Sequence, residues 1–142
     1  MNVTLEKIKG LVEEPYFSRG EKYFKDGMIK ISSISEREVK AKVLGSVVYA
    51  VELFLAKEGL DGRCSCPAFY DIGPCKHIAA VGIALIDHQK GKYQTSFDCA
   101  DQIDEYEKFE MVLKGKSKNE LISIILRMSS SCPEIIYELI EE

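Results

Sequence analysis

The chain has 142 residues, of which 46% are hydrophobic and 30% are charged, and its formal net charge is −4. This length is enough for one globular domain, or for one domain with an appendage. No apolar run is long enough to span a bilayer, and the acidic balance is unlike that of a protein dedicated to binding duplex nucleic acid.

The first half of the chain is predicted to contain short helices followed by strands. A helical pattern covers residues 4–12 and ends near Pro15, and a second segment covers residues 16–25. The four aromatic side chains of this second segment could stack on bases, although aromatics at this spacing more often belong to a core. Alternating apolar residues then indicate four strands, at residues 28–31, 39–43, 47–56 and 59–66.

The last predicted strand and the segment after it carry four residues that can bind a metal ion. Cys64 and Cys66 point to the same side of a strand, because strand side chains repeat every two residues. After a loop at residues 67–74, Cys75 is expected just before a helix and His77 in its first turn. Three cysteines and one histidine complete a tetrahedral zinc shell, so the sequence predicts one structural zinc ion per chain.

Disulfide bonding and chance clustering account less well for these cysteines. Disulfides need an oxidising compartment, but the N-terminus is charged rather than an apolar signal core, and the cysteine count of five is odd. We therefore expect a reducing, cytoplasmic location. Chance clustering of core cysteines rarely yields two ligand pairs, and the remaining cysteines, Cys99 and Cys132, are expected to be ordinary thiols.

The ligand segment resembles the SWIM zinc-finger family, whose pattern is Cys-x-Cys, a variable loop and Cys-x-His. All four predicted ligands match this pattern in order and spacing, and Ala80 stands where the recombinase-accessory branch extends it to His-x-x-Ala. The upstream segments YFSRGEKYFKDGMI and GSVVYAVELFL also resemble the lead-in of many SWIM proteins, so the resemblance covers about residues 15–90. It implies a small module for DNA or protein contacts, found beside helicases, transposases and recombinase accessory factors.

Together these elements predict an α+β fold. A small antiparallel β-meander packs on a helix that the zinc ligands join to the sheet, which gives a ββα-like SWIM module. Helices precede this module and a helical appendage follows it. We expect residues 1–92 to form the zinc-binding domain and residues 93–142 an acidic appendage, in which residues 93–101 are a linker. The first part holds 14 Lys and Arg against 12 Asp and Glu, and the second holds 5 against 11.

The appendage is predicted to consist of two or three amphipathic helices. An apolar stripe begins at Ile103, Ser117 and Glu120 form a capping box before the next stripe, and Pro133 opens a last helix. Such helices either complete the core or offer a surface to a partner.

Three functional hypotheses follow. The first is a non-catalytic adaptor in DNA transactions such as recombination or repair, which binds a protein partner through its acidic helices. The alternative is direct nucleic-acid binding through basic residues of the sheet region, namely Lys30, Lys40, Lys42, Lys57 and Arg63. The third is a zinc-dependent hydrolase, which a complete four-ligand shell disfavours because it leaves no position for a catalytic water. We predict no catalytic residues, no small-molecule substrate and no membrane association.

Overall fold

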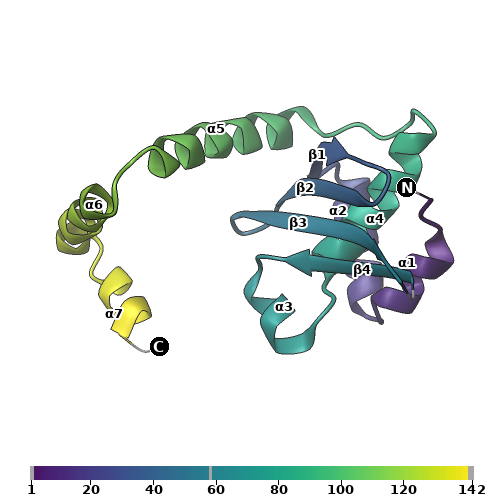
Figure 1. The fold of residues 1–142 in the computed structure, drawn as a ribbon, viewed down its shortest axis with the longest axis horizontal. Helices are drawn as coiled ribbons and strands as arrows, with labels where there is room; N and C mark the ends of the chain where they lie inside the picture. Colours follow the sequence, from purple (N-terminus) through teal and green to yellow (C-terminus); the bar gives the residue numbers. More distant parts are fainter. Residues whose placement is uncertain (1, 58, 141–142) are drawn as a thin grey trace. The chain divides into compact units, whose positions relative to one another are not determined.

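The computed structural model describes residues 2–57 and 59–140 (Figure 1). It divides into two compact units, the first ending at Glu105 and the second beginning at Tyr106. Because a compact unit need not be an independent domain, the division of the chain at residue 92 stays a prediction. The fold is α+β with a four-stranded antiparallel sheet, as the sequence predicts.

The sheet of the first unit is a meander whose strands neighbour one another in chain order. It consists of β1 (Ile29–Ile34), β2 (Glu38–Leu44), β3 (Val48–Ala56) and β4 (Gly59–Cys64), all antiparallel. In β2 the side chains of Val39, Ala41 and Val43 are buried, whereas the intervening residues are more exposed. We call the side of Val39 the inner face of the sheet and the side of Lys40 the outer face.

Three helices cover the inner face. The helix α4 (Lys76–Gln89) contacts all four strands, and α1 (Leu5–Leu11) and α2 (Tyr16–Lys25) pack on α4 (Figure 1). Because α4 lies between the sheet and these two helices, it is apolar nearly all round, and Ile78, Val81 and Leu85 are fully buried. These helices and the inner face form one hydrophobic core.

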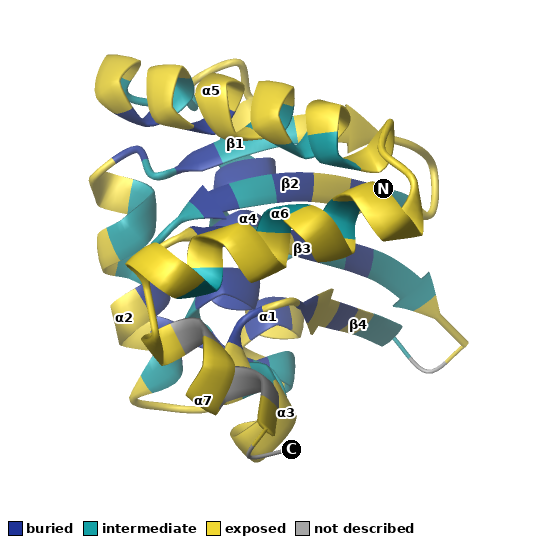
Figure 2. Ribbon diagram, turned by 90° about the vertical axis from the view of Figure 1, so that its left-hand side faces the viewer, coloured by how far each residue is buried: buried dark blue, intermediate teal, exposed yellow. Residues whose placement is uncertain are grey.

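The outer face is covered at one end by the first turns of α5 (Phe97–Lys114). Cys99 and Ile103 are buried there against Val48, and Lys30 of β1 pairs with Asp104 at 2.6 Å. The predicted linker at residues 93–101 is therefore wrong beyond Ser96, because burial of Cys99 and Ile103 on the sheet extends the helix towards the N-terminus. Figure 2 shows this row of buried positions along the start of α5.

The predicted loop at residues 67–74 also contains a helix, α3 (Pro67–Ile72). Its first residue is Pro67, which suits the first position of a helix, and Cys66 is its N-cap residue rather than the end of β4. The last strand therefore ends two residues earlier than predicted.

The second unit contains the end of α5, then α6 (Lys118–Ser131) and α7 (Glu134–Ile140). The capping box is confirmed: Ser117 Oγ accepts from the Glu120 backbone N–H at 3.2 Å, and the Glu120 carboxylate accepts from the Ser117 N–H at 3.1 Å. None of the described side chains from Tyr106 onward is buried. No helix in the described part of the chain has the length and apolar character needed to cross a membrane.

The close packing of α2 on α4 yields a stability prediction. A Cβ at Gly20 would lie 2.6 Å from both Ala79 Cβ and the Lys76 carbonyl oxygen, so Gly20→Ala is expected to destabilise the protein by about 1–3 kcal/mol. The matched control is Gly10→Ala in α1, where nothing lies within 4 Å and alanine should stabilise the helix by about 0.5–1 kcal/mol. Denaturant unfolding measures both, and equal effects would contradict the close approach.

Candidate metal centre

Each of the four predicted ligands sits at the boundary of a secondary structure element. Cys64 is the last residue of β4, Cys66 caps α3, Cys75 caps α4, and His77 lies in the first turn of α4. Cys66 and Cys75 both have an extended backbone, as is usual for the residue that precedes a helix. All four side chains are buried, with at most 4% of each residue exposed.

The spacing of the donor atoms fits a tetrahedral zinc ion. The Sγ atoms of Cys66 and Cys75 are 3.6 Å apart, and His77 Nδ1 lies 3.7 Å from Cys64 Sγ and 3.8 Å from Cys75 Sγ. All four donor atoms lie within 4.8 Å of one another. Zinc bonds of about 2.3 Å to sulfur and about 2.0–2.1 Å to nitrogen give tetrahedral edges of about 3.6–3.8 Å. The donor set and its spacing therefore both suit zinc.

The imidazole of His77 is oriented by aromatic packing. Its ring meets Tyr23 edge-on, with centroids 5.2 Å apart, and lies against Tyr49 at 4.8 Å. This packing turns Nδ1 toward the sulfurs. Within the described residues, the buried Nε2 atom has no hydrogen-bond partner.

The three thiols differ in acidity because they share hydrogen bonds at close range. The hydrogen bond from Cys64 lowers the pKa of Cys75 to about 4, and the same bond raises the pKa of Cys64 well above its usual range. Burial raises the pKa of the Cys66 thiol. The cluster without a metal therefore holds its negative charge on Cys75, and an incoming cation replaces the protons of the other two thiols.

The basic residues proposed for nucleic-acid contacts fall mostly on the outer face of the sheet. Lys30, Lys40, Lys42 and Arg63 lie there, whereas Lys57 is exposed just after β3. Carboxylates are interleaved with them: Lys40 Nζ lies 3.7 Å from Glu38 and 3.8 Å from Glu52, and Arg63 is in register with Glu52 and stacks over Phe54. A role for these five residues in nucleic-acid binding stays a prediction.

Comparison with known proteins identifies the metal-binding segment. Residues 49–85 match the family model of the SWIM zinc finger. These residues form a SWIM zinc finger. The match contains β3 apart from its first residue, β4, α3, most of α4 and all four ligands. The Cys64, Cys66, Cys75 and His77 group is placed to hold one zinc ion. No curated protein and no solved structure matches the chain significantly.

The match also indicates whether the segment is suited to binding or to catalysis. A SWIM zinc finger is a binding module rather than a catalytic domain, and here the fourth coordination position belongs to His77. The zinc ion would supply bonds that join the end of β4 to the start of α4. The upstream residues 16–29, which resemble the lead-in of other SWIM proteins, lie outside the matched segment.

The ligand set predicts which cysteines matter for metal content and stability. Elemental analysis of the purified protein should give one zinc ion per chain. The variants Cys64→Ser, Cys75→Ser and His77→Ala should each lower the zinc content and the melting temperature. The loss of stability is expected because structural zinc contributes about 10–16 kcal/mol in finger peptides. Cys132→Ser is the matched control, because this exposed thiol lies outside the group. Similar losses from Cys132→Ser would show that the ligands are wrongly assigned.

The unequal thiols predict how zinc binding depends on pH. Near pH 7 the raised pKa values keep Cys64 and Cys66 protonated without the metal, whereas Cys75 is already a thiolate. Zinc binding should therefore release about two thiol protons, and the affinity should fall about a hundredfold for each unit by which the pH is lowered around neutrality. Calorimetric titrations in buffers of different ionisation enthalpy count the protons. Release of none would contradict the protonated cluster.

Proposed function

We propose that this protein is a non-catalytic adaptor in DNA transactions such as recombination or repair. In this proposal the zinc-binding unit supplies a stable body, and the helices beyond Glu105 bind a protein partner. The link to DNA rests on the SWIM zinc finger, which often occurs in DNA-related proteins. The protein-binding role rests on the exposed apolar side chains of the second unit.

The carrying observation is that the second unit has helices but no buried side chain among those described. Met111 is 74% exposed, Leu126 is 65% exposed and Phe109 is 61% exposed. Short helices are marginal in water unless an apolar face is packed. Large exposed apolar surfaces on folded proteins mark interaction sites, so these helices are suited to packing against another protein.

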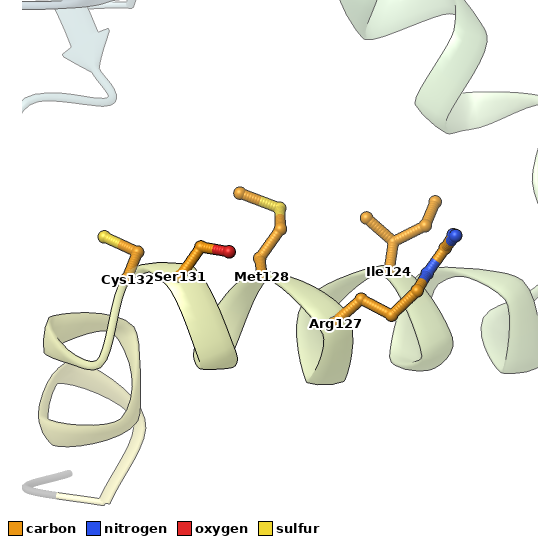
Figure 3. A pocket seen from close by; sticks show the side chains of 5 residues that line it. All are labelled: Ile124, Arg127, Met128, Ser131 and Cys132. Carbon is orange, nitrogen blue, oxygen red and sulfur yellow. The ribbon is translucent and has the colours of Figure 1, made fainter.

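The helix α6 presents the best-defined part of this surface. Ile124, Met128 and Ser131 project to one side of α6 and line a shallow groove of about 340 Å³ together with Arg127 and Cys132 (Figure 3). Residues spaced by four and three positions lie on one helix face, which is the arrangement used when an amphipathic helix docks against a partner. Residues 93–142 also hold 11 acidic and 5 basic side chains, which favours a partner with basic residues around an apolar patch.

The alternative of direct nucleic-acid binding has less support. The outer face of the sheet carries Glu38, Glu52 and Asp61 among its basic residues, and Asp104 of α5 pairs with Lys30. Such a face has little net charge, whereas binding to the phosphate backbone depends on concentrated positive charge. A hydrolase is also disfavoured, because the four-ligand group leaves no open position for water.

The adaptor hypothesis predicts a specific loss from one substitution in α6. Met128→Glu places a charge in the apolar groove and should reduce recovery of the native partner about tenfold or more, because a buried unpaired charge is costly. The matched control is Ser130→Glu, which adds the same charge at an exposed residue of the same helix outside the groove. The measurement is quantitative mass spectrometry of proteins co-purifying with each tagged full-length variant, with zinc content and melting temperature as checks on folding.

The salt dependence of binding then separates the two hypotheses. Contact with several phosphates should weaken binding by about 10³–10⁵ between about 50 and 200 mM salt, whereas an apolar protein interface should respond little. Recovery that is equal for Met128→Glu and Ser130→Glu, or affinity for nucleic acid alone with a steep salt response, would overturn the adaptor proposal.

A further inference from the structure

A small pocket lies beside the zinc ligands in the first unit. It has a volume of about 230 Å³, and its polar lining consists of Tyr23, Ser46, Tyr49, Lys76 and His77, with residues 66–68 completing the wall. No carboxylate lines it, whereas hydroxyl, ammonium and imidazole groups all do. The lining is therefore rich in hydrogen-bond donors.

The buried His77 Nε2 atom is the group in this lining that most needs an acceptor. The residue is only 3% exposed, and no described residue lies within hydrogen-bonding reach of Nε2. With Nδ1 turned toward the sulfurs, Nε2 is the ring nitrogen left to carry a hydrogen, and metal-binding histidines almost always donate that hydrogen to an acceptor. A Cβ at Gly45 would lie 2.8 Å from the Tyr49 ring and 3.4 Å from Nε2, so glycine at this position lets the chain pack closely against the two rings.

Lys76 adds positive charge to the same pocket. Its ammonium group lies 5.0 Å from the centre of the Tyr23 ring, and it forms no ion pair with the residues that the structure describes. The pocket also lies at the N-terminus of the 14-residue helix α4, whose dipole favours a negative group. An anionic oxygen would thus meet Lys76 and Nε2 together.

The size and charge of the surroundings favour one carboxylate over a phosphate chain. Pockets for drug-sized ligands enclose about 300–1,000 Å³, so this smaller one suits a single group. Three thiolates around Zn²⁺ carry about −1, and the chain as a whole carries −4, which disfavours a polyanion at this position. We propose that the pocket binds a carboxylate of a protein partner, accepting hydrogen bonds from His77 Nε2 and the Lys76 ammonium. This site lies wholly in the first unit and is separate from the α6 groove.

Acetate is the simplest probe of this site. Zinc-loaded full-length protein is titrated with sodium acetate, with sodium chloride as the ionic-strength control, while NMR follows the Nε2–H signal of His77. The one other histidine in the sequence, His88, is replaced by glutamine for assignment. We expect a saturable shift with acetate that chloride does not produce.

Lys76→Met should weaken acetate binding about tenfold at unchanged zinc content, because a hydrogen bond to a charged group is lost. Lys25→Met, at an exposed position of α2 outside the pocket lining, should change nothing.

The same titration can overturn the proposal in three ways. No saturable shift would mean that Nε2 is satisfied by water alone, and equal acetate affinity in Lys76→Met would remove the proposed charge contact. Binding of inorganic phosphate without binding of acetate would assign the pocket to phosphate ligands such as nucleic acid. The outcome is independent of the adaptor test, because Met128→Glu lies in the second unit and should leave acetate binding intact.

Discussion

The zinc-finger unit depends on the connection that four side chains make between the end of β4 and the start of α4. Cys64 and Cys66 come from the sheet side, and Cys75 and His77 come from the helix side. Without a cation, three thiols and an imidazole would be polar groups held in an apolar core, with a negative charge on Cys75. A structural zinc ion contributes about 10–16 kcal/mol of binding free energy, whereas the net free energy of unfolding of a domain is about 5–15 kcal/mol. The contribution of the metal is therefore as large as the net stability of a typical domain.

This connection determines which surfaces remain for function. The helix α4 is fixed between the sheet on one side and α1 and α2 on the other, and the contacts are close enough that a Cβ at Gly82 would lie 2.7 Å from Ile8 Cδ1. The inner face of the sheet is thereby occupied by core residues. Contacts with other molecules are left to the outer face, the rim of the zinc site and the helices beyond Glu105. Of these, the zinc site contains the buried Nε2 atom of His77, which has no partner among the described residues, while the helices carry exposed apolar side chains.

Much of the first unit can be predicted from the sequence, because periodicity and ligand spacing are local signals. Alternation locates all four strands, and the Cys-x-Cys and Cys-x-His spacing places the ligands at the ends of β4 and α4. The start of α5 cannot be predicted in this way, because the burial of Ile103 against Val48 joins residues far apart in the chain. Similarly, alternation predicts that Lys40 and Lys42 share a face, but only the strand register shows that Lys40 lies opposite Glu52. The helix α3 escapes prediction because a proline such as Pro67 suits a loop as well as the first position of a helix.

The two units are therefore suited to different parts of one binding process. The first has a closed core and can hold the donors of the zinc-site pocket in fixed positions before any ligand arrives, so little ordering entropy is lost when a carboxylate binds. In the proposed adaptor role, the helices of the second unit, none of whose described side chains is buried, would gain packing from the partner that covers them. If one partner engages both surfaces, binding at the first raises the effective concentration of the second, and two weak contacts act as one stronger contact. A partner with a carboxylate for the pocket and a basic-rimmed apolar patch for the helices would be distinguished from one that has only one of these features.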